Sequence, residues 1–364
     1  MADTPETKVE EQAGAAFGAA PSERAVPRIS IAAFCEFPDT GAVMQRAAAD
    51  RRLARAQTVV QLGGVEAAVA YFHTNPTPNL LIVSSNGAGF DPVDVEACTR
   101  AGVLVVNQSG GNAHSVAEHA LGMLLTLSKR IIEADRALRR DRDINRNNLI
   151  GTEAQGRTIG IVGIGNVGRR VAELCKGLFG MKVLAYDPYL SASEISARGA
   201  EKVELDELLR RADFVSINCP LTPETRGLMG AREFALMRPD AYFITTARGS
   251  IHDEAALDKV LADKKIAGAG LDVWEKEPPP ASHPLMKYDN VMVTPHMAGV
   301  THEARTRMGQ IAAEQMLDAL DGRPVPRIIN PQVWPAYAKR FEKTFGFKPQ
   351  DPPSEPNWHA AEKH

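Results

Sequence analysis

The sequence has few cysteines, little net charge and no long apolar run, and each of these shortages excludes a class of protein. Only four cysteines occur in 364 residues, without the spacing of a metal site or of a disulfide framework. We therefore expect no metal centre and reduced thiols, as in a cytoplasmic protein. The net charge of −3 gives no reason to expect a nucleic-acid partner. The longest apolar run, Ala120–Leu127, is too short to span a membrane.

Both ends of the chain lack the pattern of a folded segment. Residues 1–27 are rich in Ala, Gly and Glu, and they have no basic start followed by an apolar core, so we do not interpret them as a secretory signal peptide. We expect a disordered lead there and a disordered tail over residues 345–364, where the chain is polar and contains proline. We also expect no regulatory domain after Pro331.

Between these ends, short apolar runs alternate with helical patterns, which is typical of parallel α/β sheets. The predicted strands cover residues 28–36, 58–62, 80–84, 103–107, 158–162, 182–186, 214–218, 242–246, 267–273 and 291–294. The predicted helices cover residues 40–56, 64–72, 93–100, 115–139, 167–179, 205–211, 253–262 and 301–320. The fold class that follows is α/β, with two doubly wound parallel-sheet domains.

One predicted helix is unusually apolar. It begins at Ser115-Val116-Ala117-Glu118, which has the sequence pattern of a capping box, and extends to about Arg139. Because its apolar positions are dense on more than one face, we expect it to pack between domains or subunits rather than on a surface.

The most specific motif is Gly163-Ile164-Gly165-Asn166-Val167-Gly168. It follows a predicted strand, opens a predicted helix and precedes Asp187 by nineteen residues, which is the arrangement of a dinucleotide-binding turn. The glycines and the start of the helix, at Asn166 and Val167, are expected to hold the pyrophosphate. An acid at Asp187 binds ribose hydroxyls and repels a 2′-phosphate, so NAD is favoured over NADP. A tight turn without a ligand is the alternative.

Arg248, Glu277 and His296 follow three successive predicted strands of the same sheet. Because parallel strands end at one edge, these side chains are expected to meet beside the glycine turn. Arg can hold a carboxylate and polarise a carbonyl, His can exchange a proton with the carbonyl oxygen, and a paired acid favours the imidazolium. Asp272, at a strand end, is expected to meet the nicotinamide. Each residue alone could be structural, but together they favour an active site for carbonyl reduction.

Several segments together resemble the D-isomer-specific 2-hydroxyacid dehydrogenase family. They are Asn86–Asp91, Val106–Gln108, Ser115–Glu118, Gly163–Gly168, Pro220–Thr225, Thr246–Gly249, Leu271–Pro278 and Thr294–His296. The resemblance covers the chain from about Leu80 to Pro331. It implies that Arg248, Glu277 and His296 form the catalytic set.

The same resemblance implies the remaining contacts. Substrate-binding residues are expected at Asn86, Gly87, Ala88, Gly89 and Arg248. Cofactor-binding residues are expected at Gly163, Gly165, Asn166, Val167, Gly168, Asp187, Pro220, Thr225, Ala247 and Asp272. We accordingly assign a flavodoxin-like substrate domain to residues 28–107 and 301–335, and a Rossmann NAD-binding domain to residues 108–300. The family is usually dimeric, which implies a homodimer through the helix from Ser115.

Two departures from the family bear on the substrate. Asn218 stands where many members have His. Asn at this position also occurs in the related NAD-dependent formate dehydrogenases. Those enzymes carry Gln rather than Glu beside the catalytic His, so Glu277 favours a keto or hydroxy acid over formate. Residues 28–85 instead resemble the receiver-like N-terminal domain of tight-adherence pilus-assembly ATPases. This likeness raises the hypothesis of a chimeric or fusion protein with an impaired substrate domain.

Three functions are consistent with these patterns. The leading hypothesis is an NAD-dependent oxidoreductase that transfers a hydride between nicotinamide and a small D-2-hydroxy acid or 2-keto acid of the phosphoglycerate, hydroxypyruvate or glyoxylate class. The alternative is an NAD(H)-sensing binding protein on a dehydrogenase fold. A pilus-assembly or polar-localisation adaptor ranks last, because it rests on residues 28–85 alone and the sequence has no Walker-type Lys loop.

Overall fold

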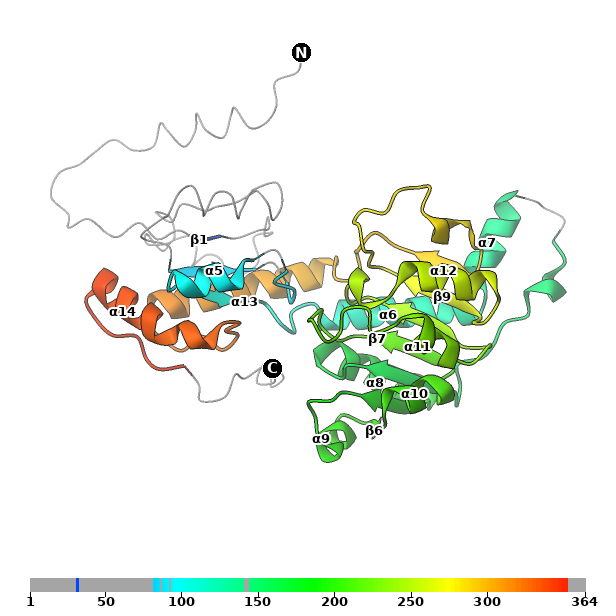
Figure 1. The fold of residues 1–364 in the computed structure, drawn as a ribbon, viewed down its shortest axis with the longest axis horizontal. Coiled ribbons are helices and arrows are strands. Elements are labelled where there is room, and N and C mark those ends of the chain that lie inside the picture. The colour runs from blue at the N-terminus through cyan, green and yellow to red at the C-terminus, as the bar shows by residue number, and fades with distance from the viewer. Residues whose placement is uncertain (1–30, 33–80, 86, 92, 141–143, 353–364) are drawn as a thin grey trace, which may run out of the picture.

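The computed structural model describes residues 31–32, 81–85, 87–91, 93–140 and 144–352. Within these ranges the chain forms two α/β lobes joined side by side (Figure 1). The smaller lobe has a three-stranded parallel sheet and the larger lobe a seven-stranded parallel sheet. The predicted α/β fold with parallel sheets is therefore confirmed. The predicted elements between residues 33 and 80 lie outside the described residues, as do residues 1–27.

The larger lobe follows the predicted order of strands closely. Its strands are β4 (Thr158–Val162), β5 (Lys182–Tyr186), β6 (Glu201–Lys202), β7 (Phe214–Ile217), β8 (Tyr242–Thr245), β9 (Gly268–Leu271) and β10 (Val291–Val293). They are arranged in the order β10-β9-β8-β7-β4-β5-β6. The sequence prediction missed only β6, a two-residue edge strand without an apolar run.

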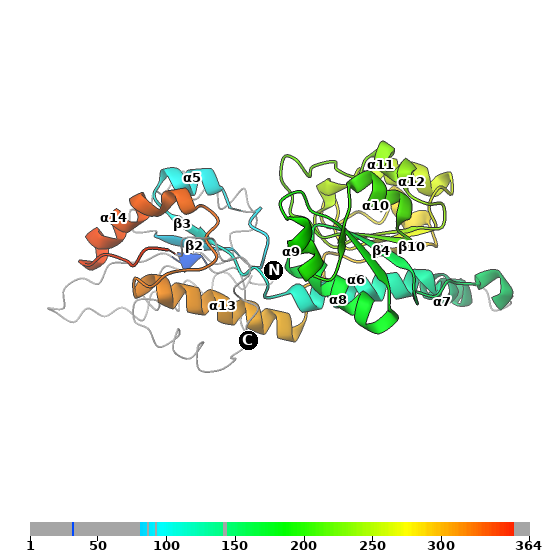
Figure 2. The same cartoon turned by 90° about the horizontal axis from the view of Figure 1, so that it is seen from below.

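Helices cover both faces of this sheet, as Figure 2 shows. The helices of this lobe are α6 (Ala113–Ser128), α7 (Ile131–Arg140), α8 (Asn166–Phe179), α9 (Ala192–Ala197), α10 (Leu205–Arg211), α11 (Ala231–Leu236) and α12 (Glu254–Ala262), with short 3-10 turns η1 (Arg146–Leu149), η2 (Gly249–Ile251) and η3 (Pro284–Lys287). Met123 of α6 and Val171 of α8 belong to one buried cluster. Leu208 of α10 and Phe234 of α11 belong to a second cluster on the opposite face. The sheet is thus buried on both sides, which explains its continuous apolar strands.

The smaller lobe is built from both ends of the described chain. Its elements are β1 (Ile31–Ala32), β2 (Ile82–Ser84), α5 (Val95–Arg100), β3 (Leu104–Val106), α13 (His302–Leu320), η4 (Pro331–Val333) and α14 (Trp334–Phe345). Met316 of α13 and Phe341 of α14 pack with β2 and β3 in one core. Asn330, which is fully buried, accepts from the Val105 N–H at 2.8 Å and donates to the Val103 oxygen at 3.0 Å. The C-terminal segment is therefore part of this lobe.

The predicted helix from Ser115 to Arg139 is wrong in two respects. It begins earlier, at Ala113, after an N-cap at Asn112 whose side chain makes no capping bond, and it is divided at Arg130, which has a φ of 54°. Ser115 is not the N-cap because it lies inside the first turn of α6, and its hydroxyl donates to the Ala298 oxygen at 2.6 Å. Neither α6 nor any other helix in the described part of the chain is long and apolar enough to cross a membrane.

The start of the predicted disordered tail is packed against the smaller lobe. The Phe347 ring contacts that of Phe341 at 5.2 Å, and the Gln350 N–H donates to the Gly322 oxygen at 2.7 Å. Phe347, although 46% exposed, supplies an aromatic contact that the polar composition of this segment did not suggest. Residues 353–364 lie outside the described residues.

A buried histidine lies in the core of the larger lobe. His252 is only 1% exposed, and neither of its ring nitrogens has a hydrogen-bond partner among the residues that the structure describes. Its ring packs at 5.6 Å from that of Phe243. Burial penalises the charged imidazolium and lowers the pKa of His252 to about 4. The folded protein therefore keeps this side chain neutral at mildly acidic pH.

Replacing His252 by Leu is expected to reduce the sensitivity of the fold to acid. The unfolded chain binds a proton at this residue below about pH 6.5, whereas the folded protein does so only near pH 4. Stability is therefore lost as the pH falls through this window, by about 1.4 kcal/mol per pH unit. Urea titrations at pH 7 and pH 5 measure how much the free energy of unfolding falls between these pH values. This fall should be smaller by about 2 kcal/mol in His252→Leu than in the wild type.

The matched control is His114→Leu, because His114 is exposed. This variant should lose as much stability between pH 7 and pH 5 as the wild type. If His252→Leu also behaves like the wild type, burial of His252 does not contribute to acid sensitivity.

Candidate active site

A cavity of about 480 Å³ lies between the two lobes. Residues from both lobes line it, including Gly89, Asp91 and Asn107 from the smaller lobe and Asn166, Cys219 and Arg248 from the larger lobe. The chain passes between the lobes at this point, and Asn166 Nδ2 donates to the Ser109 hydroxyl at 3.1 Å. The cavity therefore lies at the carboxyl ends of the large sheet, where α/β folds bind ligands.

The glycine turn between β4 and α8 has three distinct glycines. Gly163 has a φ of +84°, and a Cβ there would lie 2.7 Å from the Cys219 backbone. A Cβ on Gly168 would lie 2.2 Å from the Gly163 oxygen. Gly165 is the N-cap of α8, and a Cβ on it would meet nothing within 4 Å. Two glycines thus allow close packing, and the third leaves open space at a helix N-terminus, where a pyrophosphate fits.

Asp187 lies directly after β5 and faces the same turn. Its carboxylate accepts from the Ile164 N–H and from the Tyr189 N–H, both at 3.2 Å. On the other side of the turn, Arg198 donates to the Ile164 oxygen at 2.6 Å. The acid and the glycine turn are therefore held together, as the spacing predicted, while contact of Asp187 with a ribose stays a prediction.

The loop after β7 contains two further predicted cofactor contacts. Pro220 lines the cavity, as does Ala247 after β8, but Thr225 is not among the lining residues. The Thr225 hydroxyl donates to the Pro220 oxygen at 2.6 Å and accepts from the Thr222 N–H at 2.7 Å. Thr225 therefore shapes the loop that carries Pro220.

Cys219 lies in the same loop, against the glycine turn. Burial raises the pKa of its thiol to about 12, and the nearby Asp187 adds to this effect. The described cysteines, Cys98, Cys175 and Cys219, form no disulfide. No group of three or more His, Cys, Asp and Glu side chains in the described ranges could hold a metal ion.

The predicted substrate loop has tethered carbonyls and free N–H groups. The Gly87 oxygen accepts from the Gln108 N–H at 2.9 Å, and the Ala88 oxygen accepts from Asn107 Nδ2 at 2.7 Å. The N–H groups of Ala88 and Gly89 have no hydrogen-bond partner among the described residues. Two N–H groups at the cavity wall can therefore bind an anion.

Gln108 fixes this loop through its side chain as well. Its Oε1 accepts from the Gly87 N–H, and its Nε2 donates to the Ser84 hydroxyl, both at 2.5 Å. The sequence prediction missed this role, although Asn107 and Gln108 were part of a recognised motif. Asn86, a predicted substrate contact, lies outside the described residues.

Arg248 follows β8 and reaches across the cavity to this loop. Its Nε donates to Asp91 Oδ2 at 2.9 Å, and its Nη1 donates to the Ala247 oxygen at 2.6 Å. A Cβ on Gly89 would lie 1.6 Å from Arg248 Nη2, so the guanidinium lies directly over Gly89. The guanidinium thus lies beside the free N–H groups of the loop, and binding of a substrate anion by these donors stays a prediction.

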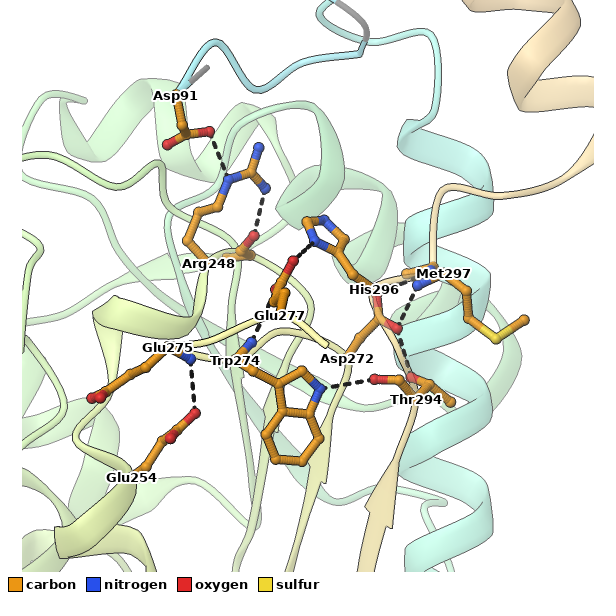
Figure 3. A network of polar contacts seen from close by, with 12 residues as sticks. Asp91, Arg248, Glu254, Asp272, Trp274, Glu275, Glu277, Thr294, His296 and Met297 are labelled. Atoms are coloured by element: carbon orange, nitrogen blue, oxygen red, sulfur yellow. Dashed lines mark hydrogen bonds and ion pairs between the residues drawn. The ribbon is translucent and has the colours of Figure 1, made fainter. Parts of the chain in front are cut away.

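Glu277 and His296 form a hydrogen-bonded pair, shown in Figure 3. The distance from His296 Nδ1 to Glu277 Oε2 is 2.6 Å, and Glu277 Oε1 accepts from the Trp274 N–H at 3.0 Å. His296 Nε2 has no hydrogen-bond partner in the described part of the chain. A carboxylate on Nδ1 orients the ring and leaves Nε2 for proton exchange with a ligand.

Asp272 organises the turn that carries His296 (Figure 3). Its carboxylate is fully buried and accepts from the Thr294 hydroxyl at 2.6 Å, the Met297 N–H at 2.8 Å and the Ala298 N–H at 2.9 Å. These bonds hold the backbone of His296 at a φ of 57°, a value that is uncommon for residues other than glycine. The predicted contact of Asp272 with a nicotinamide stays a prediction.

Comparison with known proteins identifies relatives of this architecture. Residues 121–298 match the family model described as "D-isomer specific 2-hydroxyacid dehydrogenase, NAD binding domain". A D-3-phosphoglycerate dehydrogenase from Archaeoglobus fulgidus is 40% identical over 283 residues, which cover 78% of this chain and 52% of that protein. A glyoxylate reductase from Thermofilum pendens is 40% identical over 260 residues, which cover 70% and 76%.

Solved structures agree with this result. The crystal structure of a D-lactate dehydrogenase from Aquifex aeolicus, complexed with NAD and lactic acid, has a TM-score of 0.62 and 31% identity. The match covers 67% of this chain and 78% of that one. The chain spans about half the length of the D-3-phosphoglycerate dehydrogenases that it matches.

The glycine turn predicts different effects for Gly165→Ala and Gly168→Ala. Gly165 has an ordinary φ of −72° and space for a methyl group, so its variant should keep the wild-type melting temperature. Its methyl group would occupy the approach to the helix N-terminus. The Kd for NADH should therefore rise at least tenfold, which corresponds to about 1.4 kcal/mol. Gly168→Ala should lower the melting temperature, since its methyl group meets the Gly163 oxygen.

Gly177→Ala is the control, because Gly177 is exposed on α8 and its Cβ would also meet nothing. Fluorescence titration with NADH and thermal unfolding measure the two effects. Unchanged NADH affinity in Gly165→Ala would show that no dinucleotide phosphate approaches this residue.

Proposed function

This chain belongs to the D-isomer specific 2-hydroxyacid dehydrogenase family, and on that premise we propose that it is an NAD-dependent oxidoreductase. Its substrates are a small D-2-hydroxy acid and the corresponding 2-keto acid, of the phosphoglycerate, hydroxypyruvate or glyoxylate class. The observation that supports this proposal best is the pairing of His296 with Glu277 at 2.6 Å, on the same sheet edge as Arg248. An acid–base group and an anion-binding site on neighbouring loops suit reduction of a carbonyl beside a carboxylate.

Each residue has a defined part in this reaction. A dinucleotide bound at the glycine turn supplies or accepts the hydride. Arg248 and the N–H groups of Ala88 and Gly89 bind the substrate carboxylate, and Arg248 also polarises the adjacent carbonyl. His296 donates a proton from Nε2 to the carbonyl oxygen as it becomes a hydroxyl, and takes it back in the reverse direction. Glu277 orients His296 and stabilises the imidazolium.

The cofactor contacts follow from the same arrangement. Gly163, Gly165, Asn166, Val167 and Gly168 hold the pyrophosphate at the start of α8. In addition, Asp187 binds the adenosine ribose, and Asp272 meets the nicotinamide end. Pro220 and Ala247 complete the wall, and Thr225 holds the loop that carries Pro220. A carboxylate at Asp187 favours NAD over NADP, because it repels a 2′-phosphate.

The two lobes divide this work. We propose residues 28–107 and 301–335 as the substrate domain and residues 108–300 as the NAD-binding domain. The return of α13 to the small sheet and the position of the cavity between the lobes support this division. The unpaired described cysteines agree with a reducing compartment such as the cytoplasm.

We also propose that the protein is a homodimer through α6 and α7. Ile131 and Leu138, both on α7, are 54% and 59% exposed, and Ile150 in the following segment is 77% exposed. Helix α7 projects from the end of the larger lobe (Figure 2). Large apolar side chains gathered on a projecting arm are typical of an interface between subunits.

A panel of 2-keto acids with NADH tests the proposed activity. We expect oxidation of NADH, followed at 340 nm, with glyoxylate, hydroxypyruvate or phosphohydroxypyruvate. His296→Asn should lower kcat by about 10²–10⁴-fold, because it removes the proton donor, while NADH still binds. NADH binding by folded wild-type protein without turnover of any acid would instead favour an NAD(H)-sensing protein.

Substitution on the projecting arm tests the proposed dimer. The double variant Ile131→Glu/Leu138→Glu should sediment as a monomer at concentrations where the wild type is a dimer, because charges would be buried in the interface. Leu178→Glu on α8 is the control, since Leu178 is also exposed, at 61%. A wild type that sediments as a monomer, or a double variant that remains dimeric, would contradict the proposed interface.

A further inference from the structure

Asp91 contacts Arg248 across the cavity, although the proposed mechanism gives this acid no part. The ion pair joins Asp91 Oδ2 to Arg248 Nε at 2.9 Å. Asp91 follows the substrate loop directly, whereas Arg248 belongs to the other lobe. Figure 3 shows the acid, on a loop, facing the guanidinium. The contact therefore ties the two halves of the anion-binding site to each other.

The hydrogen bonds of Arg248 leave a defined part of the guanidinium for a ligand. Of its five N–H donors, Nε is used by Asp91 and one on Nη1 is used by the Ala247 oxygen. Nη2 lies over Gly89, next to the free N–H groups of Ala88 and Gly89. The two donors on Nη2 are therefore the ones that converge with the loop on a carboxylate.

Gly89 makes room for this arrangement. Its backbone does not have the positive φ that would require glycine, yet a Cβ there would lie 1.6 Å from Arg248 Nη2 and 3.0 Å from Asp91 Oδ2. The space taken by the ion pair, rather than the backbone conformation of the turn, therefore requires glycine at this position. Any side chain at this position would push the guanidinium away from the loop.

We propose that Asp91 is a positioning residue that fixes the Arg248 guanidinium with Nη2 toward the carboxylate of a 2-keto acid. This inference rests on the proposed function. An arginine side chain loses much rotamer freedom when it is held in one geometry, and Asp91 holds it before the substrate arrives. Preorganisation of this kind strengthens binding without a further contact to the substrate.

Asp91 also carries a negative charge near an anion site, and this effect opposes the first. Its side chain is 44% exposed and that of Arg248 29%, so solvent screens the repulsion. Orientation and repulsion predict opposite results when Asp91 is removed. Loss of orientation raises KM, whereas loss of repulsion lowers it.

Steady-state kinetics of full-length variants separate these effects. In Asp91→Ala we expect KM for the active 2-keto acid to rise about tenfold or more, with a smaller change in kcat and unchanged NADH affinity. Asp91→Asn should recover part of the loss, because an amide oxygen can still accept from Nε. Gly89→Ala should reproduce the rise in KM by displacing the guanidinium. A KM that stays constant or falls in Asp91→Ala overturns the proposal.

Asp94→Asn is the matched control for Asp91→Asn. Asp94 lies three residues further along and caps α5 through the Ala97 N–H at 2.8 Å, a role that Asn also fills. It changes the same charge without touching Arg248, so KM should stay at the wild-type value. In an Arg248→Gln background, Asp91→Ala should have no further effect, and an equal loss there would mean that Asp91 does not act through Arg248.

Binding of oxamate to the NADH-loaded protein keeps this inference separate from the proposed activity. Oxamate has a carboxylate beside a carbonyl, and its binding needs no turnover. If no keto acid is reduced but Asp91→Ala weakens oxamate binding, the proposed function fails and the role of Asp91 stands. If oxamate binds equally to the wild type and to Asp91→Ala, or binds to neither, the role of Asp91 is overturned.

Discussion

The parallel direction of all strands in the large sheet is the constraint on which the site depends. Every loop that follows a strand leaves at the same edge, so Arg248, Glu277 and His296 reach one place from distant positions in the sequence. The same edge carries the glycine turn between β4 and α8. A small lobe built from both ends of the described chain then closes this edge with its own loop.

Much of this arrangement could be predicted from the sequence because local patterns determine it. The bounds of β4, β5 and α10 are the predicted ones, since each is a clear apolar or amphipathic run. Asp253 caps α12 through the Ala256 N–H at 2.9 Å, as a local cap should. The pairing of Glu277 with His296 also agrees with the order of residues along the strands.

The features that could not be predicted are those that depend on contacts between distant segments. Ser115 has the sequence pattern of a cap, but it lies inside α6, and its hydroxyl donates to the Ala298 oxygen, 183 residues away. Gln108 and Asp91 acquire their partners only when the loops of both lobes meet. The strained backbone of His296 is held by the buried Asp272, a bond network that no local pattern encodes.

The loop that packs against the glycine turn also determines how the cavity responds to reactive small molecules. Alkylating agents and peroxides attack the thiolate rather than the thiol. Because the pKa of Cys219 is raised to about 12, almost no thiolate exists there at neutral pH. The same close packing that requires Gly163 therefore keeps the sulfur beside this pocket in its weakly reactive thiol form.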